Sequence, residues 1–295
     1  MKRRDFLVTA FGGLGLALGG HRYLSPQSPL IYQDGSDVVS QSSPLLRFAA
    51  IGDVGTGNRG QDAVAQAMRR HFDTNPFSLV LLAGDNIYEH GDIKNVGRAF
   101  ERPYRFFRRI NIPFYAVLGN HDIRTNNGWD EVRYRGLNMQ GRYYSFTKES
   151  VQFFALDTNK NASWSEQLLW LEENLAQSQA PWKVVFGHHP VYSSGMHGNT
   201  LPLVEKLPPL FSRYGVQLYL SGHDHNYERT KPLQGTTYLV CGAGAMTRPV
   251  RYSDWTAYAQ ARLSFAAIEV YPNRLEIAGI GKNGQVFDRA EITNS

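Results

Sequence analysis

The chain has 295 residues, of which 42% are hydrophobic and 19% charged, so it is long enough for one large α/β domain or two small ones. Its formal net charge is +5, but the basic residues form no block, which argues against a nucleic-acid partner and leaves a surface mildly favourable to anionic substrates. The single cysteine, Cys241, excludes an internal disulfide framework and any cysteine-rich zinc site.

Residues 1–20 form a predicted export signal. A twin arginine, Arg3 and Arg4, precedes a glycine-diluted apolar stretch that is too short for a typical membrane span. This resembles a bacterial twin-arginine signal, which predicts the twin-arginine export machinery as a partner and a periplasmic or extracellular location. The alternative is an uncleaved signal that anchors the protein in the membrane. Residues 21–44, rich in Ser, Pro and Gln, are a predicted linker, so the folded domain is expected at residues 45–295.

Strands and helices are predicted to alternate in the first half of this domain. Apolar runs predict strands and amphipathic runs predict helices, in the order strand 45–51, helix 61–72, strand 78–83, helix 96–109 and strand 113–118. This βαβαβ order favours parallel strands that are covered by helices.

The second half of the domain predicts a different pairing of strands. Two alternating runs within residues 143–157 predict an antiparallel hairpin, and the following helix carries Ser163 and Glu166 at the spacing of a capping box. The later patterns predict strand 183–186, helix 203–214, strand 216–220 and three further strands, at residues 236–242, 264–270 and 274–280. The sequence therefore predicts an α/β fold with mixed sheets.

Five of the apolar runs end in a glycine that is followed within two residues by Asp, Asn or His. These strand ends read GDVG, GDNIY, GNHD, GHHP and GHDH, and they begin at Gly52, Gly84, Gly119, Gly187 and Gly222. Because α/β proteins place their chemistry beyond the carboxyl ends of strands, we expect these polar side chains to meet on one rim. Carboxylate, amide and imidazole groups are metal ligands, so the pattern predicts a metal site.

The histidines and the glycines also permit other interpretations. Residues 55–60 match the dinucleotide-binding GxGxxG pattern, but Asp53 interrupts the junction of strand and glycines, and a nucleotide-dependent oxidoreductase leaves the later histidines unexplained. Seven of the nine histidines lie in or just beyond the strand-end loops. Histidines without a common role would be spread along the chain, so this clustering favours a shared site. Of these seven, His90 and His189 are predicted to line the site or the surface rather than to bind metal.

Together, the five motifs resemble the signature of the calcineurin-like metallophosphoesterase superfamily in its purple acid phosphatase form, of the small, mammalian tartrate-resistant type. They occur in order between Asp53 and Arg229, which covers nearly the whole predicted domain. The resemblance implies a four-layer α/β/β/α sandwich with mixed sheets. It also implies a binuclear centre of Fe(III) and a divalent metal, which would be Fe, Zn or Mn.

The resemblance also implies which residues bind the metals. The ferric ion would be held by Asp53, Asp85, Tyr88 and His225, and the divalent ion by Asp85, Asn120, His188 and His223. The superfamily's first motif is Asp-x-His, but here Gly55 stands at the histidine position, and Tyr88 is expected to supply the missing ligand. Ionising a phenol of pKa about 10 at pH 7 costs about 4 kcal/mol, which a hard trivalent cation supplies more readily than Zn²⁺ or Mg²⁺.

The implied function is an exported acid phosphatase that hydrolyses small phosphate monoesters through attack by a metal-activated hydroxide. His121 and His197 would lie outside the metal ligands, and either is a candidate for the acid that protonates the leaving group. The chain runs directly from Asp157 to Ser163, where mammalian-type members carry a long regulatory loop, which predicts an open site without proteolytic activation. The alternatives are a phosphodiesterase or nucleotidase on the same ligands and, less favoured, a non-catalytic metal-binding protein.

Overall fold

The computed structural model describes residues 43–293, and the predicted export signal and most of the predicted linker lie outside this range. One sheet has the order β13 (Val286–Thr293), β12 (Arg274–Gly281), β11 (Ser264–Val270), β1 (Leu46–Ile51), β2 (Leu79–Leu82) and β3 (Phe114–Ala116). The other has the order β10 (Thr256–Gln260), β8 (Tyr227–Thr230), β9 (Thr237–Cys241), β7 (Leu218–Ser221), β6 (Trp182–Phe186), β5 (Val151–Ala155) and β4 (Tyr144–Lys148). The α-helices are α1 (Arg59–Thr74), α2 (Arg105–Arg109), α3 (Trp129–Arg133), α4 (Trp164–Gln177) and α5 (Leu201–Tyr214).

Both sheets are mixed, as predicted. In the first sheet β1, β2 and β3 are parallel, whereas β11, β12 and β13 continue from β1 in antiparallel pairs. In the second sheet β5, β6, β7 and β9 are parallel, and the predicted hairpin is present as the antiparallel pair β4 and β5. Strand β8 pairs antiparallel with both β9 and β10.

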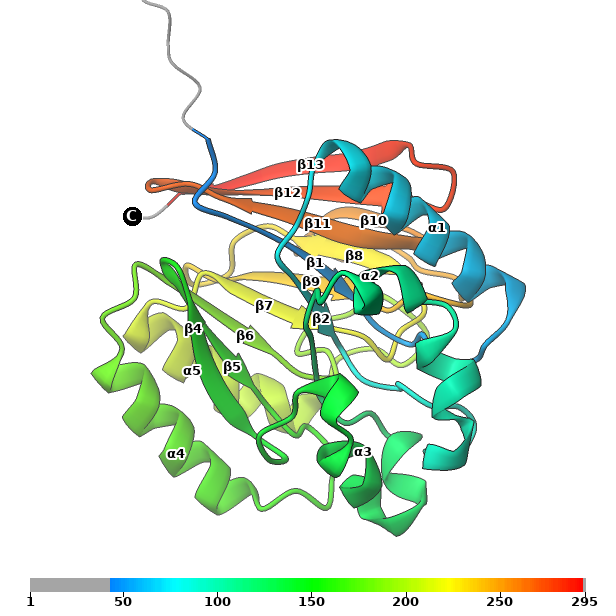
Figure 1. The fold of residues 1–295 in the computed structure, drawn as a ribbon. Coiled ribbons are helices and arrows are strands. Elements are labelled where there is room, and N and C mark those ends of the chain that lie inside the picture. The colour runs from blue at the N-terminus through cyan, green and yellow to red at the C-terminus, as the bar shows by residue number, and fades with distance from the viewer. Residues whose placement is uncertain (1–42, 294–295) are drawn as a thin grey trace, which may run out of the picture. The chain divides into compact units, whose positions relative to one another are not determined.

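The two sheets face each other and helices cover their outer faces, so the four-layer sandwich is confirmed (Figure 1). Phe48 of β1 and Phe153 of β5 meet between the sheets, edge to face, with ring centroids 5.2 Å apart. Helix α1 lies against β11 and β12 on the outer face of the first sheet. Leucines of α4 and α5, such as Leu171 and Leu207, belong to the apolar cluster on the outer face of the second sheet.

Strand β5 has few polar residues because side chains on both of its faces are buried. Neighbouring side chains of a strand point to opposite faces, and both faces of β5 are covered. Phe153 therefore packs in the core between the sheets, whereas Phe154 packs under the helices. Val184 and Val185 of β6 divide in the same way.

Two local predictions are wrong. The single helix predicted for residues 96–109 is broken at Pro103, because proline has no amide hydrogen to continue the helical ladder. A π-helical turn (Gly97–Glu101) precedes the break and the short helix α2 follows it. The capping box at Ser163 does not form either, since the Ser163 side chain makes no cap hydrogen bond and α4 begins without one.

The patterns also leave β8, β10 and β13 unpredicted. In β8 and β13 an ion pair between the sheets hides the apolar alternation: Arg229 Nε lies 2.7 Å from Asp288 Oδ2, and the Tyr227 hydroxyl donates to the same oxygen at 2.8 Å. Charged residues that are buried in pairs look like solvent-exposed residues in a sequence pattern. Within residues 43–293, no helix is long and apolar enough to cross a membrane.

Candidate metal centre

The five strand-end loops follow β1, β2, β3, β6 and β7, and they bring the seven predicted metal ligands close together. Three of these strands belong to the first sheet and two to the second, so the site lies where the two sheets present their carboxyl ends (Figure 1). Asp53, Asp85, His188 and His225 are almost completely buried there. The rim that was expected from the sequence is therefore present as one compact group of side chains.

One cluster consists of Asp53, Tyr88 and His225. The Tyr88 hydroxyl lies 3.1 Å from Asp53 Oδ1 and 3.3 Å from His225 Nε2, and Asp53 Oδ1 lies 3.4 Å from His225 Nε2. Ligand atoms about 2.0 to 2.1 Å from one ion stand about 2.9 to 3.4 Å from each other. The three donor atoms therefore have the mutual spacing of ligands to a common ion.

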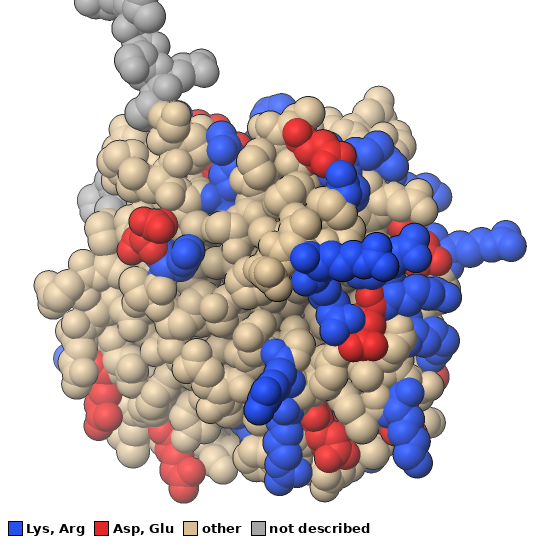
Figure 2. Space-filling view, viewed as in Figure 1, with Lys and Arg blue, Asp and Glu red and all other residues tan. Residues whose placement is uncertain are grey.

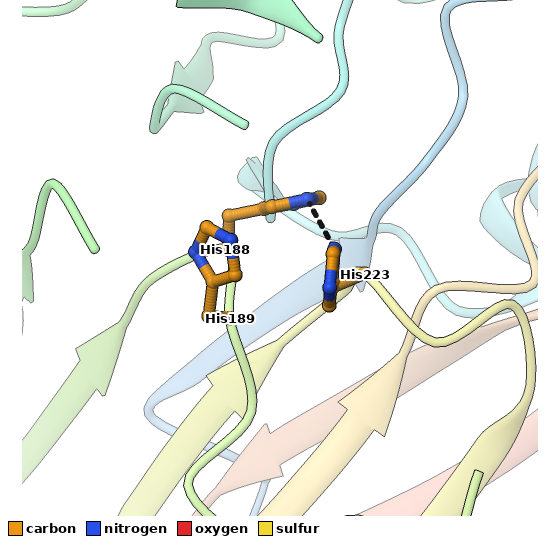
Figure 3. Close-up of side chains that lie close together, drawn as sticks. All are labelled: His188, His189 and His223. Atoms are coloured by element: carbon orange, nitrogen blue, oxygen red, sulfur yellow. Dashed lines mark hydrogen bonds between the residues drawn. The ribbon is translucent and has the colours of Figure 1, made fainter. Parts of the chain in front are cut away.

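A second cluster consists of Asn120, His188 and His223. Asn120 Oδ1 lies 3.0 Å from both His188 Nε2 and His223 Nδ1, and those two nitrogens lie 3.2 Å from each other. Figure 3 shows the His188 and His223 rings directed toward one another from different loops. These three donor atoms also have the spacing of ligands to one ion.

Asp85 connects the two clusters. Its Oδ1 lies 3.6 Å from His188 Nε2, and donor atoms of Asp53, Asp85 and His188 all lie within 4.8 Å of one another. The main-chain amide of His121 donates to the same Oδ1 at 2.9 Å and fixes the carboxylate. Its position between the clusters fits a carboxylate that is shared by two ions.

The backbone is strained where it presents these side chains. Asp53, Asp85 and His223 have φ of 56°, 53° and 68°, a left-handed conformation that is uncommon for residues other than glycine and is typical of functional sites. Gly55 and Gly119 make room for the chain around them. A Cβ at Gly55 would stand 2.3 Å from the main chain of Asn86, and one at Gly119 would stand 2.1 Å from Asp85 Oδ1. The superfamily's histidine therefore has no space at position 55.

The buried charges perturb one another's ionisation. Burial opposes the ionisation of Asp85, but the neighbouring His188 and His121 hold the pKa of its carboxyl below the usual value. Burial also disfavours a charged His188, but Asp85 and Asp53 raise the pKa of its imidazole above the usual value. Burial and the charge of His188 lower the pKa of His223 far below its usual range, so that ring is a neutral donor.

Tyr88 indicates what kind of cation these residues fit. Burial, and then the carboxylates of Asp53 and Asp85, raise the pKa of its phenol far above the ordinary value. The phenol can bind as a phenolate only if a highly charged cation compensates both effects. Two carboxylates, one phenol, one amide and three imidazoles form a hard oxygen and nitrogen donor set, which suits iron and borderline divalent metals.

His121 and His197 flank the two clusters without belonging to them. The His121 ring packs edge to face on Tyr88 at 4.6 Å, and the His197 ring stacks on His223 at 4.1 Å. His121 Nε2 lies 3.2 Å from Arg124 Nη2, and His197 Nε2 contacts Arg248 Nη1. Because a guanidinium only donates, the Nε2 atoms of both histidines are acceptors in this arrangement.

His189 lies closer to the centre than its predicted lining role requires. Its ring centroid is 4.6 Å from that of His223 and 5.0 Å from that of His188, and the three residues form a group with metal-binding geometry. Its Nδ1, however, is engaged by the Thr158 hydroxyl at 2.9 Å. The side chain therefore borders the second cluster. His90 is exposed, and no ligand contact of its side chain is present among the described residues.

Sequence reasoning missed three residues that hold the loops in place. Asp122 accepts hydrogen bonds from the amides of Gly119 and Asn86 and so ties two motif loops together. Asp224 accepts from Ser193 Oγ and from the His197 amide, and Thr158 accepts from the amides of His188 and His189. The two aspartates stand inside the GNHD and GHDH motifs, so their positions carried a signal, whereas nothing in the pattern indicated Thr158.

Comparison with known proteins relates this chain to phosphoesterases both by sequence and by fold. Residues 46–227 match the family model described as calcineurin-like phosphoesterase. The tartrate-resistant acid phosphatase type 5 of Oryctolagus cuniculus is 32% identical over 253 residues, which cover 70% of this chain and 75% of that protein.

Solved structures also share the fold, and two of them illustrate this. GAP50, the anchor in the inner membrane complex of Plasmodium, has a TM-score of 0.75 at 22% identity and covers 85% of this chain and 89% of its own. Purple acid phosphatase PPD1 from yellow lupin seeds has a TM-score of 0.69 at 19% identity, and the match covers 85% of this chain and 54% of the lupin chain.

Proposed function

The chain belongs to the calcineurin-like phosphoesterase family, and from this premise we propose that it is an acid phosphatase of the purple acid type, acting on small phosphate monoesters. The observation that carries the proposal is the convergence of the seven predicted ligands into two three-residue clusters with Asp85 between them. A binding protein for a single metal would need only one such cluster. Two adjacent ions are typical of enzymes that displace groups at phosphorus.

The metal centre that we propose contains Fe(III) and a divalent ion, either Fe, Zn or Mn. Asp53, Asp85, Tyr88 and His225 would hold the ferric ion, because only this cluster contains the phenol. Asp85, Asn120, His188 and His223 would hold the divalent ion. When bound, the two ions would supply positive charge to the phosphate oxygens and lower the pKa of a water that attacks phosphorus.

The chain's own residues would orient the substrate and move the proton. We assign His121 and His197 to the two sides of the phosphoryl group, where one of them protonates the departing oxygen from Nε2. The P–O bond to the leaving group then breaks, and the alcohol departs with that proton. Because Arg124 and Arg248 donate to these Nε2 atoms, the relevant hydrogen bond must open before the histidine can carry its proton there.

We also propose that the protein acts outside the cytoplasm. The support is the sequence of residues 1–20, with its twin arginine and short apolar stretch. A protein whose metals are loaded before export would suit that route. Cell fractionation of the full chain, compared with an Arg3→Lys, Arg4→Lys double variant, tests this proposal. Wild-type protein that stays in the cytoplasm would contradict the location, and equal export of both proteins would contradict the twin-arginine route.

The catalytic proposal is tested by steady-state rates on two nitrophenyl esters. Metal-loaded protein should hydrolyse p-nitrophenyl phosphate with a much higher kcat/KM than bis(p-nitrophenyl) phosphate, and protein stripped of metal should hydrolyse neither. A preference for the diester would indicate a phosphodiesterase. No activity in fully loaded protein would indicate a non-catalytic metal-binding protein.

A further inference from the structure

Two arginines contact the two histidines that flank the candidate metal centre. Arg124 ends a short 3₁₀ turn (Asp122–Arg124), and its Nη2 lies 3.2 Å from His121 Nε2. Arg248 lies in the loop after β9, and its Nη1 contacts His197 Nε2. The same arrangement therefore arises twice, on different loops and on opposite clusters of the site.

Each guanidinium contacts the Nε2 of its histidine, and the histidine lies between the guanidinium and the metal ligands. On one side, His121 Nε2 is 4.0 Å from Asp85 Oδ2, and Arg124 stands beyond it. On the other, the His197 ring stacks on His223, and Arg248 contacts that ring while its main-chain amide donates to His225 O at 2.8 Å. Groups in this position reach the part of a substrate that lies outside the transferred phosphoryl group.

These two arginines differ in their partners from other arginines of the chain. Figure 2 shows Lys and Arg gathered on the side of the molecule where α1 and α2 lie, with Asp and Glu among them. Arginines of these two helices pair with carboxylates, as Arg69 of α1 does with Asp73 at 2.8 Å and Arg108 of α2 with Glu101 at 2.9 Å. Among residues 43–293, no ion pair joins Arg124 or Arg248 to a carboxylate. Their charges are available to a ligand.

We propose that Arg124 and Arg248, here called the rim arginines, bind negative charge on the leaving group, so that the preferred substrates are phosphate monoesters with a second anionic group. This inference rests on the proposed phosphatase function and narrows its substrate class. A guanidinium presents a planar fork of donors that matches carboxylate and phosphate oxygens. The hydrogen bonds to His121 and His197 hold the two forks at the entrance until such a group arrives.

The charge around the entrance is consistent with this role. Besides Asp85, the carboxylate of Glu89 approaches His121, with its Oε2 3.6 Å from His121 Nδ1, and the Glu89 side chain is 70% exposed. Arg124 does not pair with that carboxylate but donates to the Glu89 main-chain oxygen at 3.2 Å. An ester with a neutral leaving group would offer the two guanidinium groups no anionic partner and would gain no binding energy from them.

The test compares two substrates that differ only in a carboxylate: phenyl phosphate and 4-carboxyphenyl phosphate. We expect wild-type metal-loaded protein to have the higher kcat/KM on the carboxylated ester. Arg124→Gln and Arg248→Gln should each lower that preference about tenfold, and the double variant should remove it, because each loses one charge-assisted hydrogen bond. Arg124→Lys and Arg248→Lys keep the charge and should retain part of the preference. The matched control is Arg213→Gln on α5, where the guanidinium pairs with Glu172 at 3.2 Å, and it should change neither rate.

Binding without turnover separates this inference from the proposed function. Calorimetric titrations with benzylphosphonate and 4-carboxybenzylphosphonate, which cannot be hydrolysed, should show the same dependence on the rim arginines. A protein that binds the carboxylated phosphonate more tightly but hydrolyses no ester would overturn the phosphatase proposal and leave the rim assignment standing. Equal losses on both substrates, unchanged rates in the double variant, or no preference in the wild type would each overturn the rim assignment.

Discussion

Replacing Thr158 with valine tests how a single hydroxyl positions the second cluster. Thr158 is buried, and its Oγ1 accepts from the main-chain amides of His188 at 3.2 Å and His189 at 2.9 Å, while also contacting His189 Nδ1 at 2.9 Å. Valine has nearly the same shape but no hydrogen-bonding group. The substitution therefore leaves two amides and one imidazole nitrogen without their partner at the loop that carries His188.

The size of the effect follows from these contacts. A buried donor without a partner costs about 1 to 3 kcal/mol, and His189 is less completely buried than His188. We expect Thr158→Val to lower the free energy of unfolding of the metal-free protein by about 2 to 4 kcal/mol, a large part of a typical total of about 5 to 15 kcal/mol. Because His188 loses its support, the affinity for the divalent ion should fall about 10- to 100-fold.

Thr158→Ser is the matched control, because serine keeps the hydroxyl and removes only a methyl group. Urea unfolding followed by circular dichroism gives the free energies, and titration with Zn²⁺ gives the metal affinities. The serine variant should hold metal like the wild type and lose about 1 kcal/mol of stability. If the valine variant is as stable as the serine variant and binds Zn²⁺ equally well, the hydroxyl does not position His188.

Three further predictions concern the histidines and the loop beside them. Replacing His121 and His197 together with alanine should lower turnover on p-nitrophenyl phosphate about 10²- to 10⁴-fold while elemental analysis finds the wild-type metal content, and loss of metal would contradict their placement outside the ligands. Burial, and then the charge of His188, lower the pKa of His189 to about 3. The folded protein therefore favours the neutral ring, and the stability that this ring contributes is complete above about pH 6.5 and is lost as the pH falls toward 3. Metal-free His189→Gln should therefore lose less stability than the wild type between pH 7 and pH 4 in urea unfolding, and equal losses would contradict that pKa. Limited proteolysis should not raise phosphatase activity, because only the short segment 156–163 joins β5 to α4, and a large activation would contradict the open site.

Much of the fold could be predicted because most buried strands carry their signal locally. Runs such as residues 79–83 and 184–186 are apolar throughout, since both of their faces are covered, and a glycine follows each run. The patterns failed where a distant residue completes the structure. Arg229 of β8 is partly buried because Asp288 of β13 stands opposite it, 59 residues later, and neither residue alone indicates a core strand.

The candidate site was predictable in a similar way. The motifs that follow the strands indicated the seven predicted ligands, because parallel strands bring their carboxyl ends together. The contacts around those ligands were not predictable. Thr158 reaches His188 and His189 from a loop 30 residues earlier, and Arg248 reaches His197 from 51 residues later. Such pairs form through tertiary packing, and neither spacing nor residue type indicates them.

The central claim is that Tyr88 binds a ferric ion beside a divalent one. The visible spectrum and the iron content of oxidised, iron-loaded protein, measured for the wild type and for Tyr88→Phe, test it most directly. We predict that the wild type is purple or pink through charge transfer from the phenolate to iron. We also predict that the variant folds, loses the band and retains less iron, because it lacks the oxygen that lies 3.1 Å from Asp53 and 3.3 Å from His225. A colourless iron-loaded wild type, or an unchanged spectrum in Tyr88→Phe, would contradict the assignment.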